Sequence, residues 1–169
     1  RRTPFIQFKE KRTCGTSVLT VKNLSHSIGN EKVLDNISFT VEKGNKIAIV
    51  GKNSLSKTTL LDIISENLKP DSGSIEWGES ISQSYFPKDN TPFFEDKKPL
   101  NEWLGQYQEE NDADAIRSFL GRMLFSGDDA MTNVNVLSGG EKARAMFSKM
   151  MLEQGNTLIF DEPTDHLDL

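Results

Sequence analysis

A short loop between an apolar segment and a helix start constrains this chain more than any other feature. Residues 49–64, IVGKNSLSKTTLLDII, predict a buried strand, a tight loop and an amphipathic helix. Gly51, Lys57 and Thr58 match the phosphate-binding pattern G-x-x-x-x-G-K-[ST], but Ser56 stands where the second glycine belongs. The pattern therefore predicts a phosphate site with one residue out of place.

The chemistry of such a loop comes from its backbone as much as from its side chains. Successive N–H groups and the positive end of the following helix hold phosphates, while the lysine neutralises their charge and the hydroxyl binds Mg²⁺. If the backbone at Ser56 takes a glycine-type angle, its Cβ costs about 1–2 kcal/mol, so we expect strain but a usable site. The alternative is an ordinary capped helix start that binds no ligand. The other motifs of the chain must decide between this alternative and a phosphate site.

A second motif, LSGGE, begins at Leu137. Ser138 and Glu141 have the spacing of a capping box, which needs no ligand. Gly139 and Gly140 are not explained by a cap, because two glycines in a first helical turn cost roughly 1 kcal/mol each relative to alanine. We therefore expect a phosphate to approach this backbone closely, with the Ser138 hydroxyl as an added donor.

A third motif, TLIFDE, places Asp161 and Glu162 directly after an apolar strand. Ligands of α/β sheets gather at such strand ends. We expect Asp161 to hold a metal ion and Glu162 to polarise an attacking water. The alternative, two acids that cap the next helix, loses weight because strand, phosphate loop, LSGGE, strand and Asp-Glu follow in order within one chain.

Composition limits the class of protein. A chain of 169 residues suits one domain, and it contains neither an apolar run near the roughly 20 residues of a membrane span nor a signal-peptide pattern. Cys14 is the only cysteine, which excludes an internal disulfide framework and a cysteine metal cluster and fits a reducing cytosol. The first twelve residues carry five basic side chains and one acidic one, which suits contact with nucleic acid or a solvated linker.

The remaining pattern predicts an α/β architecture. We expect strands at residues 18–21, 33–41, 46–50 and 157–160 and within 69–78 and 81–86. The continuously apolar segment 46–50 should be buried on both faces. We expect helices at 57–65, at 139–152, and around an apolar stripe formed by Ile116, Phe119, Leu120, Met123 and Leu124, which Asp112 or Asp114 could cap.

These motifs together resemble the ATP-binding cassette family over nearly all of residues 18–169. GKNSLSKTT looks like its Walker A, LSGGE like its signature, and TLIFDEPT like its Walker B with the catalytic glutamate. LSGGEKAR and DEPTDHLD are similar to the soluble ABC-F proteins, whose usual D-E-P-T-N-H-L-D has Asp165 here in place of asparagine. His166 belongs to this motif and is not the switch histidine, which would lie beyond Leu169.

The resemblance implies a fold and a domain plan. The fold would be an α/β P-loop NTPase domain of the ABC type, with an antiparallel β-subdomain, an incomplete RecA-like core and a helical subdomain at about 100–152. RRTPFIQFKEKR is similar to the end of the ABC-F interdomain linker, so residues 1–17 would end a linker and 18–169 would form part of the second cassette. The chain would then be a fragment that is inactive alone.

The resemblance also implies site residues and partners. ATP would lie on the loop Gly51, Lys52, Asn53, Ser54, Leu55, Ser56, Lys57, Thr58 and Thr59. Thr58 and Asp161 would bind Mg²⁺, and Glu162 would be catalytic. Ser138, Gly139, Gly140 and Glu141 would close over ATP held by the first cassette of the same protein. The whole protein would be a cytoplasmic, ribosome-associated ATPase that also meets tRNA and serves translation regulation, rescue or antibiotic resistance, with no membrane partner and no metal cluster.

Departures from the family pattern leave alternatives open. Ser56 and Ser54 replace glycines, and Ile28 falls where an aromatic side chain usually stacks on adenine. Lys88 falls where a glutamine usually helps to hold Mg²⁺, and a charged lysine cannot be a metal ligand, while Gln83 does not align with that position. The alternatives are an ATPase subunit of a membrane transporter and a degenerate ATP-binding module that does not hydrolyse.

Overall fold

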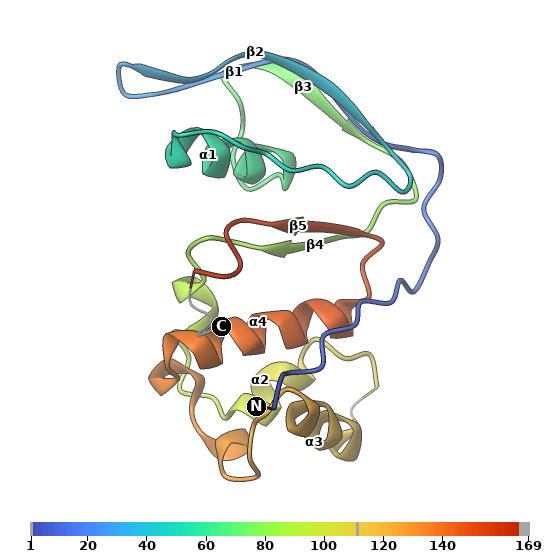
Figure 1. Cartoon of the computed structure of the whole chain (residues 1–169), viewed down its shortest axis with the longest axis vertical. Coiled ribbons are helices and arrows are strands. Elements are labelled where there is room, and N and C mark those ends of the chain that lie inside the picture. Colours follow the sequence, from blue (N-terminus) through green and yellow to red (C-terminus); the bar gives the residue numbers. More distant parts are fainter. Residues whose placement is uncertain (1, 111, 166–169) are drawn as a thin grey trace. The chain divides into compact units, whose positions relative to one another are not determined.

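The computed structural model describes residues 2–110 and 112–165, which divide into two compact units (Figure 1). The sheet unit comprises Lys11–Tyr85 and Asn156–Asp161, and the helical unit comprises residues 2–10, Phe86–Gly155 and 162–165. The expectations for Arg1 in the basic segment and for His166, Leu167 and Asp168 in the DEPTDHLD motif lie outside the described residues.

The sheet unit contains an antiparallel sheet in the order β2-β1-β3 (Figure 1). Its strands are β1 (Ser17–Ile28), β2 (Glu31–Glu42) and β3 (Ser72–Trp77). β-Branched side chains favour these strands, and the core residues of β1 include Val18, Leu19, Val21 and Leu24. The strands predicted at 18–21 and 33–41 are confirmed, and both extend further than predicted.

A bulge in β1 explains a glycine in β3. Asn23 has a φ of 49°, in the left-handed region that asparagine tolerates, and the β1–β2 register shifts between Val21 and Leu24. Gly73 lies beside this bulge with a φ of 89°, and a Cβ there would clash with the Asn23 carbonyl oxygen. The close approach of the two strands therefore requires glycine at this position.

Helix α1 (Ser54–Ile64) lies against the sheet, in contact with β2 (Figure 1). It begins at Ser54 and not at the predicted Lys57, because the Asn53 side chain caps it by accepting a hydrogen bond from the Ser56 N–H. Its buried face enters the core of the sheet unit. That face consists of Thr59, Leu60, Leu61, Ile63 and Ile64.

The apolar segment 46–50 differs from its prediction. It is not a strand, and Ile47, Ile49 and Val50 are 55%, 37% and 87% exposed. A strand that is buried on both faces needs hydrogen-bonded neighbours in a sheet that is covered on both sides. Among the described residues the sheets contain only β2, β1 and β3, and β4 and β5, so this segment has no strand beside it.

Strands β4 (Gln83–Phe86) and β5 (Thr157–Phe160) form a second, two-stranded sheet. Asn156 fixes the start of β5: its N–H donates to the Ser82 carbonyl at 3.0 Å, and its side-chain oxygen accepts from the Ser82 N–H at 2.9 Å. Both strands are confirmed, but β5 is less buried than predicted, since only Ile159 among its residues is fully buried. The end of β5 leads directly into Asp161.

The helical unit contains α2 (Leu100–Gly105), α3 (Ala113–Arg122) and α4 (Gly139–Glu153), together with short 3₁₀ turns at Thr91–Phe94, Asp129–Met131 and Val134–Val136. Trp103 on α2 is 1% exposed, stacks on Phe94 and donates from Nε1 to the Phe93 carbonyl at 2.7 Å. This aromatic cluster anchors the unit. No described helix is long and apolar enough to cross a bilayer.

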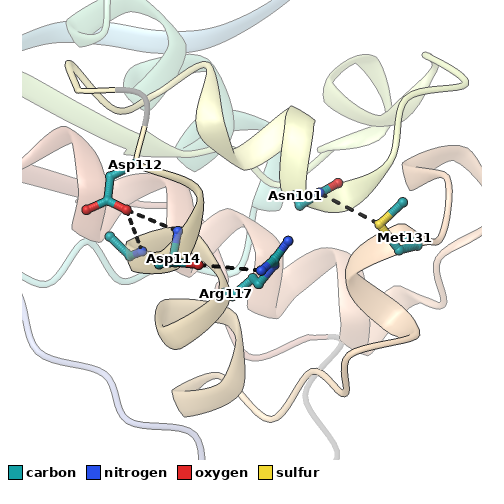
Figure 2. A network of polar contacts seen from close by, with 6 residues as sticks. Asn101, Asp112, Asp114, Arg117 and Met131 are labelled. Atoms are coloured by element: carbon teal, nitrogen blue, oxygen red, sulfur yellow. Dashed lines mark hydrogen bonds and ion pairs between the residues drawn. The ribbon is translucent and has the colours of Figure 1, made fainter.

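The predicted apolar stripe lies on α3 and the residues after it. Ile116, Leu120 and Met123 are buried, whereas Phe119 is half-buried and Leu124 is 36% exposed. The stripe ends there because α3 stops at Arg122 and Leu124 has a left-handed φ of 65°. Figure 2 shows the start of this helix and its polar neighbours.

Of the two candidate caps for α3, Asp112 is the one used. Its carboxylate accepts from the N–H groups of Asp114 and Ala115 at 3.0 Å each (Figure 2). Asp114 instead pairs with Arg117 at 3.4 Å, one turn along the helix. Nearby, Asn101 on α2 points toward Met131.

The segment before β1 has no regular secondary structure, and its first part contacts the helical unit. The Phe5 N–H donates to the Arg122 carbonyl at 3.1 Å, and the Arg122 guanidinium lies 5.8 Å from the centre of the Phe5 ring. The Gln7 N–H lies 3.3 Å from the sulfur of Met151 on α4. Residues 2–10 therefore pack as part of this unit. Their role as the end of a linker stays a prediction.

Candidate nucleotide-binding site

The predicted phosphate loop leads into the capped N-terminus of α1. Gly51, Lys52 and Asn53 precede the helix and are exposed, and Ser54, Leu55 and Ser56 form its first turn. The first N–H groups of a helix and its dipole favour an anion. The sequence predicted these residues as a phosphate site but missed the capping role of Asn53, which an asparagine before a helix start indicates.

Ser56 does not carry the strain that the sequence predicted. It lies within α1, and no positive φ occurs at this position. Its N–H donates to the Asn53 side-chain oxygen at 3.2 Å, and the next N–H, of Lys57, donates to the Asn53 carbonyl at 3.3 Å. The prediction was wrong because the helix starts before Ser56, and a serine has ordinary backbone geometry in a first helical turn.

Thr58, on α1, forms a hydrogen bond with Asp161, the residue after β5. The Thr58 hydroxyl donates to the Asp161 carboxylate at 2.7 Å, and Asp161 is only 3% exposed. The contact joins α1 to the end of β5 across 103 positions of sequence. It brings together the two oxygen groups that the sequence assigned to a metal ion.

The oxygen atoms of Thr58 and Asp161 fit Mg²⁺. This ion prefers oxygen ligands and is usually bound by one or two protein groups, with phosphates and water as the remaining ligands. The described part of the chain contains no group of three or more acidic, histidine or cysteine side chains that could hold a metal without a substrate. A magnesium ion at Thr58 and Asp161 would thus depend on a phosphate ligand. Thr59, by contrast, is 3% exposed and belongs to the buried face of α1.

Side-chain hydrogen bonds fix α1 to β3, to β4 and to Asp161, the residue after β5. Besides the Thr58–Asp161 bond, the Tyr85 hydroxyl on β4 donates to Asp62 at 3.0 Å, and Trp77 Nε1 on β3 donates to the Ile64 carbonyl at 2.8 Å. Burial and then the charge of Asp62 raise the pKa of Tyr85 above its usual 10.0, so the phenol remains a donor. The helix that carries Lys57 is thereby held along its whole length.

Glu162 lies in the helical unit with an unusual backbone. Its φ is 48°, in the left-handed region, which costs a residue with a side chain about 1–2 kcal/mol. The Asp165 N–H donates to the Glu162 carbonyl at 3.3 Å and closes a turn. Strained backbone of this kind is often found at functional sites.

Lys88 forms an ion pair with Glu162. Its Nζ lies 3.0 Å from Glu162 Oε2, and the two side chains are 39% and 31% exposed. Sequence reasoning recognised that Lys88 is unsuited to bind a metal ion but missed this pairing. The available signal was the order of the chain, because Lys88 follows β4 at the same offset as Glu162 follows β5, and β4 and β5 are neighbours in one sheet.

The LSGGE motif forms the N-terminus of α4. The Glu141 N–H donates to the Ser138 hydroxyl at 3.3 Å, and the Ser138 N–H donates to the Glu141 carboxylate at 2.7 Å, which is a complete capping box. Ser138 and Gly139 are exposed, and Gly140 and Glu141 are half-buried. The cap is confirmed, and the approach of a phosphate to the two glycines stays a prediction.

The predicted site residues therefore fall into two groups. The sheet unit holds the phosphate loop, Thr58 and Asp161, and the helical unit holds Glu162, Lys88 and the LSGGE motif. Ile28, the expected adenine neighbour, ends β1 and is 42% exposed. Gln83 begins β4.

Comparisons with known proteins agree with this geometry. The family model described as ABC transporter matches residues 34–165. The uncharacterised ABC transporter ATP-binding protein YkpA of Bacillus subtilis is 50% identical over 171 residues, which cover all of this chain and 32% of YkpA. ABC transporter F family member 5 of Arabidopsis thaliana is 36% identical over 165 residues, which cover 97% of this chain and 24% of that protein.

A further relative carries a functional name. The energy-dependent translational throttle protein EttA of Haemophilus influenzae is 35% identical over 159 residues, which cover 92% of this chain and 28% of EttA. The chain thus spans between 24% and 32% of the length of these relatives. The predicted fold class, an ABC-type nucleotide-binding domain with an antiparallel β-subdomain and a helical part, is confirmed. The chain belongs to the ABC transporter family as an ATP-binding domain, and its relatives include ABC-F proteins.

Proposed function

We propose that this domain binds ATP with Mg²⁺ and hydrolyses it within a longer ABC-F protein that acts on the ribosome. The observation that supports the chemistry is the 2.7 Å contact between Thr58 and Asp161 beside the N-terminus of α1. It places a hydroxyl and a carboxylate together at the helix end where phosphates bind most readily. Membership of the ATP-binding family supports the same nucleotide.

The roles of the residues follow from their positions. The first-turn N–H groups of α1 and the Lys57 side chain would bind the phosphates. The Ser56 N–H would exchange its hydrogen bond to Asn53 for one to a phosphate oxygen. Thr58 and Asp161 would hold Mg²⁺, which would neutralise charge on the transferred phosphate. Glu162 would orient the water and accept its proton. The exposed Ser138 and the glycines after it would meet ATP held by another cassette.

Support for the ribosome comes from the relatives. EttA is named as a translational throttle, and the Arabidopsis relative is named as a member of the F family. Because the chain spans less than a third of YkpA and of EttA, the activity and partners of the whole protein are part of the proposal. The partners we propose are the first cassette of the same protein, the ribosome and tRNA, and the location is the cytoplasm.

The experiment combines turnover with ribosome association in the full-length protein. Glu162→Gln should lower ATP turnover at least about 100-fold, because it removes a proton acceptor while ATP still binds. The variant should also cosediment with ribosomes more strongly than the wild type when ATP is present, since hydrolysis no longer ends the ATP-bound state. Glu95→Gln, an exposed glutamate of the same unit, is the matched control and should behave as the wild type.

The outcomes separate the competing functions. Normal turnover by Glu162→Gln would remove this residue from the mechanism. ATP binding without measurable turnover by the wild type would favour a module that uses ATP only as a structural clamp, the alternative left open by the departures at Ser56, Ile28 and Lys88. Absence of ribosome association, with recovery of the protein in complex with a membrane-spanning partner, would favour a transporter subunit.

A further inference from the structure

The ion pair between Lys88 and Glu162 is built by the neighbouring strands that precede these residues. β4 ends at Phe86 and β5 ends at Phe160, and the chain continues from each strand into one member of the pair. The backbones that carry the lysine and the glutamate are thus both anchored in the same sheet. The separation of 3.0 Å is short enough for a charge-assisted hydrogen bond.

Solvent exposure limits what this pair can do for stability. Side chains that are 39% and 31% exposed remain well solvated, and ion pairs of this kind contribute little to folding. The contact does fix one carboxylate oxygen, Oε2, against a cation. A carboxylate that must meet a water molecule depends on such orientation, because small displacements of a catalytic group cost large factors in rate.

The backbone of Glu162 gives a second reason why this side chain needs a partner. With a φ of 48°, the residue has a conformation that side chains rarely adopt, and it persists only where neighbouring contacts hold it. The turn closed by Asp165 holds the main chain, and Lys88 holds the carboxylate. Asp165 thus contacts the main chain of Glu162, and Lys88 contacts its side-chain carboxylate.

We propose that Lys88 is the positioning residue for Glu162. The inference rests on the proposed hydrolysis of ATP and adds a residue to it. Lys88 acts through the glutamate and not through the metal, since an ammonium group has no lone pair for Mg²⁺. Its part in the site is therefore electrostatic orientation of the carboxylate that acts on the water. Removal of its charge should slow the chemical step and leave nucleotide binding intact.

Substitutions in the full-length protein test this role. Lys88→Met removes the charge and keeps the length of the side chain, and we expect kcat to fall about tenfold while KM and the affinity for a fluorescent ATP analogue change less than about twofold. Lys88→Arg keeps the charge and should restore most of kcat. Lys97→Met, at an exposed lysine of the same unit, is the control and should leave kcat unchanged.

Two further measurements separate positioning from a general structural effect. In the nucleotide-free protein, Lys88→Met should speed amide hydrogen exchange in residues 161–165 but not in α4. In a Glu162→Gln background, Lys88→Met should produce no further loss of kcat, because the carboxylate that it positions is already absent.

The results distinguish this inference from the proposed function. If the wild type hydrolyses ATP and Glu162→Gln abolishes the activity, an unchanged or raised kcat in Lys88→Met overturns the role of Lys88 alone. An additive loss in the double variant also overturns it. A wild type that does not hydrolyse ATP, or one that is indifferent to Glu162→Gln, overturns the proposed function itself.

Discussion

At the residue scale, the conformation of Ser56 depends on where α1 begins. The Asn53 cap starts the helix at Ser54, so Ser56 has the dihedral angles of a first turn and its side chain costs nothing sterically. The G-x-x-x-x-G-K-[ST] pattern predicted correctly that Lys57 and Thr58 belong to a helix, although that helix begins at Ser54 and not at Lys57. It did not predict the backbone angle at Ser56, because a pattern of residue types does not specify where the preceding cap lies.

This geometry leads to a prediction for Ser56→Gly. Glycine relieves no strain at a helical φ, and in a helix it is less favourable than other residues by up to about 1 kcal/mol. We expect the affinity of the full-length protein for a fluorescent ATP analogue to change less than about threefold in either direction, within that free-energy difference. Lys57→Met, which removes the charge that we propose binds phosphate, is the comparison and should weaken binding strongly. A tenfold gain for Ser56→Gly would show instead that binding requires a glycine-type angle.

At the element scale, α1 is positioned by its hydrogen bonds to β3, to β4 and to Asp161, which follows β5. The bond between Tyr85 and Asp62 is the one that pH can test. Burial and the Asp62 charge raise the pKa of Tyr85 above its unfolded value, so the protonated phenol stabilises the folded state. This contribution is fully present below about pH 10, the unfolded pKa, and is lost as the pH rises through the higher folded value.

We therefore predict that Tyr85→Phe destabilises the sheet unit by about 1 kcal/mol at neutral pH through loss of one hydrogen bond. Amide exchange of α1 in the full-length protein at pH 7 should be faster in the variant. The difference between the urea midpoints of wild type and variant should be constant up to about pH 10 and shrink above it. A difference that grows with alkaline pH would contradict the assigned donor. Tyr107 is the internal control, since Tyr107→Phe leaves the contacts of α1 intact.

The elements differ in how well the sequence predicts them. α3 and α4 were predicted well because their caps, Asp112 and Ser138, are local signals. The strands β1 and β2 were predicted because β-rich residues and the alternation of apolar positions are also local signals. The apolar segment 46–50 was not, since a buried strand exists only where other strands flank it, and such pairing is a long-range property.

At the scale of the whole molecule, the predicted site residues belong to both units, some to the sheet unit and others to the helical unit. The sequence indicated Thr58 and Asp161 from separate motifs, and the fold brings them together at 2.7 Å. The spacing of residues within a motif does not predict a contact between two motifs that lie 103 positions apart. The sequence indicated Glu162 as well but not its pairing with Lys88. That contact depends on β4 and β5 being neighbours, although they are far apart in sequence.

The central claim is that a phosphate and Mg²⁺ meet at the N-terminus of α1, and magnesium-dependent ATP binding by the full-length protein tests it most directly. We predict that calorimetric titration gives clearly tighter binding of ATP with Mg²⁺ than with a chelator. Thr58→Val should remove most of this difference and leave the chelator value unchanged, because it deletes one proposed metal ligand. Wild-type binding that is equally tight with and without Mg²⁺, or no binding of ATP, would contradict the account.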